Sequence, residues 1–291
     1  MIKIGIVGTG MLGEAVGLHL LDSGYNVTVF NRTKEKTEKL ETKGALVVNS
    51  PKQVAENSDL IITVVKDADA VNDVIFGDIG IILGRHDNMC IADMSTVNPN
   101  STKEISEHVN SYEIDYLEIP VMGGPNVAID GKLVLMASGR KEVFDKYKSV
   151  FEKIGNPAFY LGDTGTAHSI KLAMNLQIAM LALSLSEGIT LTKNAGFEPE
   201  VFLKILNSTY FKTGMSENKA YKMIKENYQP TFTLSNLKKD LDTINDTADS
   251  FNTELPMTKL ARKVYADAAD AGFGDIDYTG ILEYIKTLSD K

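Results

Sequence analysis

Apolar positions in the first half of the chain form short β-rich runs, and segments with helical spacing separate most of them. An opening run covers residues 1–7, a second ends at Asn31, and further strands are predicted over residues 45–48, 59–65, 89–93, 114–119, 132–137 and 158–161. Helices are predicted over residues 69–76, 101–109 and 141–154. This alternation is typical of an α/β domain with a doubly wound, mainly parallel sheet.

The second half of the chain has a different pattern, because the β-rich runs stop beyond Gly162 and helical spacing continues. Helices are predicted over residues 165–195, 198–207, 215–226, 235–250, 256–270 and 277–289. The first of these, with Asp163 and Thr164 as N-cap candidates, is long enough to bridge two domains. The pattern predicts an α/β domain over residues 1–163 and an all-helical domain over residues 164–291, joined by a long interdomain helix.

The turn after the opening run carries glycine at three positions, Gly8, Gly10 and Gly13, and an amphipathic helix begins there. In such a turn Gly8 permits the tight bend, Gly10 lets the backbone approach a pyrophosphate, and Gly13 allows the helix to pack close to the strand. The phosphate then lies at the helix N-terminus, beside Met11 and Leu12. This arrangement predicts a Rossmann-type dinucleotide-binding domain.

The end of the second predicted strand selects between the two nicotinamide dinucleotides, and here it reads Asn31-Arg32-Thr33. An acidic residue at this position holds the ribose 2′-hydroxyl of NAD. Neutral Asn31 can instead hydrogen-bond a 2′-phosphate, and Arg32 can bind it as a bidentate, charge-assisted pair, with the Thr33 hydroxyl close by. The predicted cofactor is therefore NADP(H), and the alternative is an ordinary basic turn in contact with solvent.

Composition and charge limit the binding partners, the cellular location and the metal sites that we expect. The chain has 291 residues and a net charge of −9, with a pI near 5.1, which argues against binding to nucleic acid or to an anionic membrane. The single Cys90 cannot form an internal disulfide, and no signal-peptide pattern precedes the first strand, so we expect a cytoplasmic location. The histidines lack metal-ligand spacing, so no metal site is expected. Polar residues interrupt the long apolar helix and argue against a membrane span.

Three polar residues on the long predicted helix, His168, Lys171 and Asn175, are spaced i, i+3 and i+7. They therefore share one face and can converge on one object. A lysine in apolar surroundings is costly to bury unless it has a partner or a task. In a hydride-transfer enzyme Lys171 would protonate a carbonyl oxygen while Asn175 held the substrate. The alternative is a lysine that reaches solvent and a satisfied core amide.

These motifs together resemble those of the β-hydroxyacid dehydrogenase family, which includes 3-hydroxyisobutyrate dehydrogenase, tartronate semialdehyde reductase and the glyoxylate and succinic semialdehyde reductases. The resemblance rests on the glycine turn, residues 93–96, residues 120–125 with Gly131, and Gly165 through Lys171 to Asn175. Residues 238–241 match a Lys-Asp-Leu element of the family. The resemblance spans nearly the whole chain and implies a hydride-transferring enzyme.

The resemblance also implies roles for individual residues. Lys171 matches the essential lysine of the family, and Asn175 matches its substrate-orienting asparagine. Ser95 and Thr96 match the loop beside the nicotinamide ribose and ring, and Ser95 is also assigned to the substrate site. Lys239 matches a lysine near the cofactor ribose, in a region that the neighbouring Asp240 orients. The remaining cofactor-site assignments are Val65 and Lys66, where the predicted strand 59–65 ends.

One segment of the predicted substrate site departs from the family. The usual Ser-Gly-Gly reads Met122-Gly123-Gly124, so the backbone that receives the substrate carboxylate remains but the serine hydroxyl is absent. Loss of one such hydrogen bond would weaken substrate binding by about 1 to 3 kcal/mol. Alternatively, the pocket favours a more apolar substrate. Met122 therefore affects the prediction of the substrate more than that of the reaction type.

The sequence as a whole predicts an NADP(H)-dependent oxidoreductase. Hydride would pass between the nicotinamide and a small carboxylate-bearing aldehyde or keto acid and its hydroxy acid, with residues 164–291 serving substrate binding and dimerisation. The resemblance implies a homodimer or homotetramer, although the amphipathic segments 201–206 and 255–264 can equally close the helical domain's own core. Two alternatives stay open: a non-catalytic cofactor-binding scaffold, and an oxidoreductase that acts on imines or amino acids.

Overall fold

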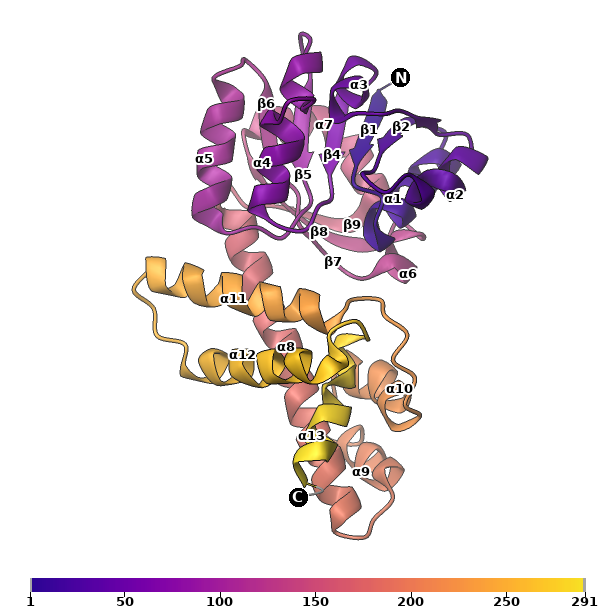
Figure 1. Cartoon of the computed structure of the whole chain (residues 1–291), viewed down its shortest axis with the longest axis vertical. Helices are drawn as coiled ribbons and strands as arrows, with labels where there is room; N and C mark the ends of the chain where they lie inside the picture. Colours follow the sequence, from indigo (N-terminus) through magenta and orange to yellow (C-terminus); the bar gives the residue numbers. More distant parts are fainter. Residues whose placement is uncertain (1, 290–291) are drawn as a thin grey trace. The chain divides into compact units, whose positions relative to one another are not determined.

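The computed structural model describes residues 2–289 and divides into two compact units, Met1–Lys171 and Leu172–Lys291. Met1, at which the predicted opening run starts, and Asp290 and Lys291 lie outside the described residues. Figure 1 shows a sheet flanked by helices in the first unit and helices in the second. We call them the sheet unit and the helical unit.

The sheet unit has the strand order β3-β2-β1-β4-β5-β6-β8-β7, with β9 paired to β8. The strands are β1 (Lys3–Val7), β2 (Asn26–Phe30), β3 (Leu46–Val47), β4 (Leu60–Thr63), β5 (Cys90–Asp93), β6 (Asp115–Glu118), β7 (Val121–Met122), β8 (Leu133–Gly139) and β9 (Gly155–Tyr160). Strands β1 to β6 pair in parallel, whereas β6 and β7 each pair with β8 in the antiparallel sense. The predicted Rossmann-type, mainly parallel sheet is confirmed, and its order reverses between β1 and β4, where ligands bind in such folds.

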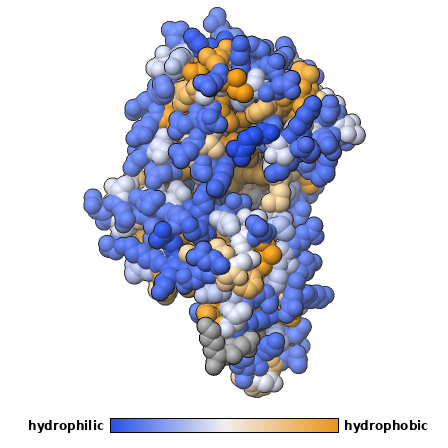
Figure 2. All heavy atoms as spheres, in the orientation of Figure 1, coloured by the Kyte–Doolittle hydropathy of each residue, from blue (hydrophilic) through white to orange (hydrophobic). Residues whose placement is uncertain are grey.

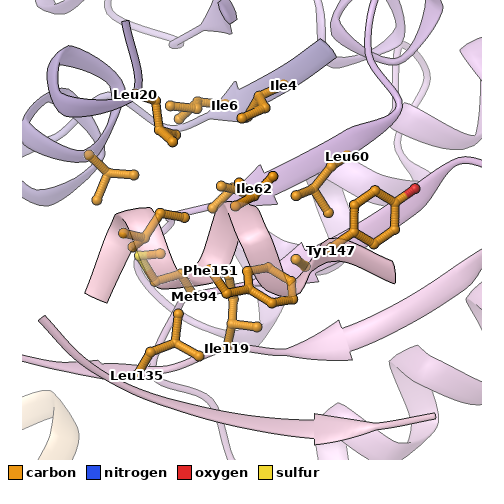
Figure 3. Close-up of a cluster of buried hydrophobic side chains, with 14 of the residues drawn as sticks. Ile4, Ile6, Leu20, Leu60, Ile62, Met94, Ile119, Leu135, Tyr147 and Phe151 are labelled. Atoms are coloured by element: carbon orange, nitrogen blue, oxygen red, sulfur yellow. The ribbon is translucent and has the colours of Figure 1, made fainter. Parts of the chain in front are cut away.

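Helices cover both faces of this sheet. They are α1 (Met11–Asp22), α2 (Glu38–Thr42), α3 (Pro51–Glu56), α4 (Ala68–Phe76), α5 (Pro99–Asn110), α6 (Pro125–Ala128) and α7 (Lys141–Ile154). Because side chains alternate across a strand, Ile62 packs in the core under α1 and α7 while its neighbour Ile61 packs under α3, α4 and α5. Figure 3 shows Ile62 and Ile4 gathered with Leu20 of α1 and Phe151 of α7.

Helix α8 (Thr166–Asn194) begins in the sheet unit and continues into the helical unit. The boundary between the units, at Lys171 and Leu172, lies beyond the predicted domain boundary at residues 163–164, because the first turn of α8 is bonded to strands of the sheet unit. By length and composition alone α8 would also suit a membrane span. In this fold, however, Leu172, Ala179 and Ala182 are buried in the core of the helical unit.

The helical unit contains α9 (Pro199–Leu206), α10 (Ala220–Ile224), α11 (Leu234–Ser250), α12 (Pro256–Ala268) and α13 (Ile281–Ser289). Helices α11 and α12 run side by side (Figure 1) and bury Leu237, Leu241 and Tyr265 in one core. The predicted helices are all present, although 215–226 begins with a π-helical turn at Met215–Lys219 and 256–270 ends in one at Ala269–Phe273.

Most apolar residues lie inside the two units, and hydrophilic side chains cover most of the face shown in Figure 2. Some positions of the two amphipathic segments are exceptions. Val201 and Ile205 of α9 and Leu260 of α12 are exposed by 47%, 62% and 56%. These side chains do not close the core of the helical unit, and subunit association through them stays a prediction.

Candidate active site

The turn between β1 and α1 has room for a phosphate group. Gly8 has a φ of +100°, and a Cβ atom on Gly13 would lie 2.0 Å from the carbonyl oxygen of Gly8, so α1 packs directly on the turn. A Cβ atom on Gly10 would meet no other atom within 4 Å, and Gly10 caps α1 without a side-chain hydrogen bond. The first amides of α1 are therefore uncapped and lie beside open space, as a bound pyrophosphate requires.

Asn31 connects this turn with the segment that follows β2. Its Oδ1 accepts a hydrogen bond from Thr9 N at 3.0 Å, and its Nδ2 donates to Thr33 O at 2.8 Å. Asn31 therefore fixes both loops by its amide, a role that the sequence analysis did not include. Arg32 is exposed, and among the described residues Thr9 Oγ1 is one of the buried oxygens without a hydrogen-bond partner. The exposed side chain of Arg32 and the buried, unpaired hydroxyl oxygen of Thr9 therefore belong to the two segments that Asn31 joins.

Polar side chains close the carboxyl ends of three neighbouring parallel strands. Thr63 of β4, Asp93 of β5 and Glu118 of β6 stand side by side in register, and all three are fully buried. Thr63 Oγ1 donates to Asp93 Oδ1 at 2.7 Å, and Ser95 N donates to the same oxygen at 3.1 Å. Ser95 Oγ accepts a hydrogen bond from Val65 N at 3.0 Å. A hydrogen bond therefore connects the loops after β4 and β5, both of which are predicted to line the cofactor site.

Glu118 also caps the N-terminus of α8. Its carboxylate accepts hydrogen bonds from Gly165 N and, at 3.0 Å, from His168 N. A carboxylate satisfies the unpaired amides of a helix N-terminus and interacts favourably with the helix dipole. The expectation that Asp163 or Thr164 caps this helix is therefore corrected, because a side chain from the distant strand β6 takes the amides.

His168 is fully buried beneath the first turn of α8. Its Nε2 lies 2.8 Å from Ser95 O, and its Nδ1 lies 2.9 Å from Glu118 Oε2 and 3.1 Å from Thr102 Oγ1. Burial opposes both charges, but the mutual hydrogen bond and charge outweigh it, so the pKa of His168 is raised and the pKa of Glu118 is lowered. His168 belongs to the interior of the sheet unit, and the expectation that it converges on one object with Lys171 does not hold.

Lys171 lies one helical turn after His168, in the same unit. Its Nζ donates a hydrogen bond to Met122 Sδ at 3.2 Å. Met122 is followed by Gly123, which has a φ of +120°, and by Gly124, the N-cap residue of α6. The ammonium group therefore lies beside the loop predicted to receive the substrate carboxylate. A thioether is a weak acceptor, so a substrate oxygen can replace it.

Asn175 lies one turn further along α8, in the helical unit. Its Nδ2 donates to Asp240 Oδ2 at 2.6 Å, and Lys239 Nζ forms an ion pair with Asp240 Oδ1 at 2.6 Å. Asn175 is 1% exposed, and its Oδ1 is a buried acceptor with no hydrogen-bond partner in the described part of the chain. Asp240 therefore fixes the orientation of the amide, whose oxygen is buried and unpaired.

The remaining predicted site residues lie at the ends of strands and helices. Met11 is exposed and Leu12 half-buried at the start of α1, Thr96 is half-buried, and Lys66 is exposed with its Nζ 3.9 Å from Asp67 Oδ2. Within residues 2–289 no group of three His, Cys, Asp or Glu side chains is arranged to hold a metal ion.

Sequence reasoning missed the residues that hold α8 in place. Glu118 and Thr102 contact His168, and Ser138 Oγ accepts a hydrogen bond from Ala167 N at 3.3 Å. One signal was present, because Glu118 is a charged residue near the carboxyl end of the predicted strand 114–119, where ligands and catalytic groups gather in parallel sheets.

Comparison with known proteins agrees with this fold. Residues 3–162 match the family described as the NAD binding domain of 6-phosphogluconate dehydrogenase, and residues 165–285 match NAD-binding of NADP-dependent 3-hydroxyisobutyrate dehydrogenase. Glyoxylate/succinic semialdehyde reductase 1 from Arabidopsis thaliana is 30% identical, over 98% of this chain and 98% of its own. The structure is similar to that of 3-hydroxyisobutyrate dehydrogenase from Salmonella typhimurium, with a TM-score of 0.89, 23% identity, and coverage of 98% of this chain and 100% of that one.

This chain belongs to the β-hydroxyacid dehydrogenase family. The matching family and the Arabidopsis relative are named as a dehydrogenase and a reductase. A relative of another kind is also similar, the cytokine-like nuclear factor N-PAC from Xenopus tropicalis, which is 32% identical over 96% of this chain. The chain spans about half the length of that relative, 52%.

Proposed function

We propose that this protein is an NADP(H)-dependent reductase of small carboxylate-bearing aldehydes or keto acids, with Lys171 as the general acid and, in the reverse direction, the general base. The observation that carries the proposal is the position of Lys171 Nζ, 3.2 Å from Met122 Sδ. The proposed proton donor then contacts the side chain of the residue that precedes Gly123-Gly124, within one unit. The names of the Arabidopsis relative and of the matching 3-hydroxyisobutyrate dehydrogenase family support this class of substrate.

The residues of the sheet unit suit NADP(H) better than NAD(H). The glycine turn and the start of α1 would hold the pyrophosphate, and the exposed guanidinium of Arg32 would pair with the 2′-phosphate. No carboxylate follows β2 at residues 31–33 to repel that phosphate. When bound, the cofactor supplies the hydride for the carbonyl carbon.

Lys171 would supply the matching proton to the carbonyl oxygen. The substrate carboxylate would lie on the Gly123-Gly124 backbone, so that its carbonyl group reaches the ammonium group in place of Met122 Sδ. The Oδ1 of Asn175, held by Asp240, would accept a hydrogen bond from the hydroxyl group of the product. Because Met122 presents a thioether and no hydroxyl, we expect substrates with an apolar substituent to be favoured over those rich in hydroxyl groups.

The first test is the oxidation of NADPH by the purified protein with glyoxylate, succinic semialdehyde, methylmalonate semialdehyde and tartronate semialdehyde. Lys171→Ala should lower kcat by ~10²- to 10⁴-fold, the usual contribution of general acid catalysis, and leave NADPH binding intact. Lys148→Ala serves as a control, since it removes an exposed lysine of the same unit whose ion pair with Glu152 contributes little. Full turnover by folded Lys171→Ala would reject Lys171 as the acid.

The cofactor assignment has its own test. Arg32→Asp should weaken NADPH binding by ~10-fold or more and leave NADH binding almost unchanged, because the new carboxylate repels only the 2′-phosphate. Lys148→Asp makes the same change of charge at an exposed position in α7 and should affect neither cofactor. Equal losses for NADPH and NADH in Arg32→Asp would contradict a contact with the 2′-phosphate.

One alternative is favoured by a specific observation, the similarity to N-PAC, whose name denotes a nuclear factor. A non-catalytic cofactor-binding protein would bind NADPH but oxidise it with none of the four carbonyl compounds. The substrate panel therefore separates the two functions, and activity on amines or imines would identify the remaining alternative.

A further inference from the structure

The buried contacts of His168 reach two parts of the sheet unit on which the proposed reaction depends, the Ser95 loop and the start of α8. Its Nε2 contacts the carbonyl oxygen of Ser95, in the loop assigned to the cofactor and substrate, at 2.8 Å. Its Nδ1 contacts Glu118 at 2.9 Å, and Glu118 accepts the N-terminal amides of α8, the helix that carries Lys171. The Ser95 loop and the lysine are thus connected through one imidazole ring.

The hydrogen-bonding groups around this ring favour a proton on each of its nitrogens. Ser95 O can only accept, so Nε2 must carry a proton. At Nδ1 the Glu118 carboxylate also accepts, since it already takes two backbone N–H groups at the start of α8. The side chains therefore form an ion pair, and the charged or titratable groups that approach it are Asp93 and, through Asp93, Tyr116.

Burial makes this pair rigid. His168 and Glu118 have no exposed side-chain area, and Thr102 and Ser138 fix the surrounding backbone and ring by hydrogen bonds. A fully satisfied buried polar network holds one geometry, because each alternative arrangement leaves a buried donor or acceptor without a partner.

We propose that the Glu118–His168 pair is a positioning device, which holds the Ser95-Thr96 loop and the Lys171 turn of α8 in one fixed relation. The inference rests on the proposed function, since it assumes that these two segments hold the cofactor and the proton donor. Neither His168 nor Glu118 touches the reacting groups. They act through Ser95 and Lys171, and a displacement of either segment by about 1 Å is enough to slow a reaction substantially.

Two substitutions at His168 break the connection at different ends. His168→Asn places an amide near the position of Nδ1, so it retains the contact with Glu118 and loses the one with Ser95 O. His168→Gln places an amide near the position of Nε2, so it retains the contact with Ser95 O and loses the one with Glu118. Tyr147→Phe is the matched control, because it removes partly buried hydrogen bonds to Asp59 O and Asn88 O in the same unit, just before the amino ends of β4 and β5 and away from their carboxyl ends.

The measurements are the dissociation constant of NADPH, from nicotinamide fluorescence, and kcat and KM for the best carbonyl substrate. His168→Asn should raise the NADPH dissociation constant by ~10-fold, because the Ser95 loop is released. His168→Gln should leave that constant within ~3-fold of wild type and lower kcat by ~10- to 100-fold, because the Lys171 turn is released. Tyr147→Phe should change neither quantity, although it lowers the midpoint of thermal unfolding.

The two His168 variants must differ for the proposal to survive. Folded variants with wild-type NADPH affinity and wild-type kcat, or with identical losses in both quantities, would overturn it. A wild-type protein that binds NADPH but reduces no carbonyl substrate would reject only the proposed function, and the comparison of NADPH affinities would still decide the positioning role. A wild-type protein that bound neither NADPH nor NADH would overturn both.

Discussion

Helix α8 carries a buried polar cluster in each unit, and the two clusters differ in how completely their hydrogen bonds are made. The first-turn cluster, His168 with Glu118, Ser95 and Thr102, has a partner for both ring nitrogens and both carboxylate oxygens. The mid-helix cluster, Asn175 with Asp240 and Lys239, leaves the buried Asn175 Oδ1 without one in the part of the chain described.

This difference in hydrogen bonding distinguishes groups that stabilise the fold from groups that can bind a ligand. A closed network gains nothing from a ligand, because every donor and acceptor is already used. An orphaned buried acceptor costs free energy until a donor arrives. Other buried oxygens in the helical unit, such as Tyr265 Oη and Asn245 Oδ1, are orphaned too. Asn175 is distinguished from them because it lies one helical turn from Lys171 and its amide is oriented by Asp240.

The largest expected effect on stability comes from removing the carboxylate of the first-turn cluster, which we call the closed cluster because all its hydrogen bonds are made. Glu118→Leu should destabilise the protein by ~3 to 5 kcal/mol, because it leaves the buried imidazole without its counter-charge and the α8 amides without an acceptor. Asp240→Leu should cost less, ~1 to 3 kcal/mol, since Lys239 retains 20% exposure and can be solvated. Urea unfolding monitored by hydrogen exchange at residues 165–171 and 237–241 assigns each loss to its unit.

Equal destabilisation by the two substitutions would show that the clusters do not differ as the hydrogen bonds indicate. A second pattern would also contradict the comparison: if Glu118→Leu left exchange at residues 165–171 unchanged, the carboxylate would not hold the first turn of α8. Tyr147→Phe provides the reference for the loss of partly buried hydrogen bonds without loss of a charge.

The sequence predicted the strands and the helix that carry the two clusters but not the hydrogen bonds within them. Alternating β-rich and helical runs predicted the parallel sheet, since the buried strands must be apolar on both faces. The glycine turn and the lysine helix were visible as local motifs. Spacing along α8 placed His168 on the same face as Lys171, and this was correct for the helix alone.

What the sequence could not predict depended on contacts across long distances in the chain. His168 bonds to Ser95 and Glu118, which lie 73 and 50 residues away. Such pairs follow from strand order and from where each strand ends, and no local pattern encodes them. Asn31 is a further case: its predicted contact with the cofactor stays a prediction, and the hydrogen bond of its Oδ1 with Thr9 N, 22 residues away, was not predicted.

A smaller effect, the pH dependence of the free energy of unfolding, tests whether the His168 and Glu118 side chains of the closed cluster are charged. The pKa of His168 is raised from 6.5, so its contribution is complete below pH 6.5 and is lost as the pH rises through the folded value. The pKa of Glu118 is lowered from 4.5, so its contribution is complete above pH 4.5 and is lost as the pH falls through the folded value. The pair should therefore stabilise the sheet unit most between pH 4.5 and 6.5.

The measurement is the free energy of unfolding from pH 4 to 9 for wild type and His168→Asn, whose difference cancels the other titrating groups. The difference should shrink as the pH rises above 6.5, because only wild type loses a proton from the pair. The change should be smaller than that of Glu118→Leu, since neutral His168 still donates from Nε2 to Ser95 O and can accept at Nδ1 from the Thr102 hydroxyl. A constant difference would mean that the imidazole is not protonated in the folded protein, and the closed cluster would then be a neutral network that holds α8 without charge.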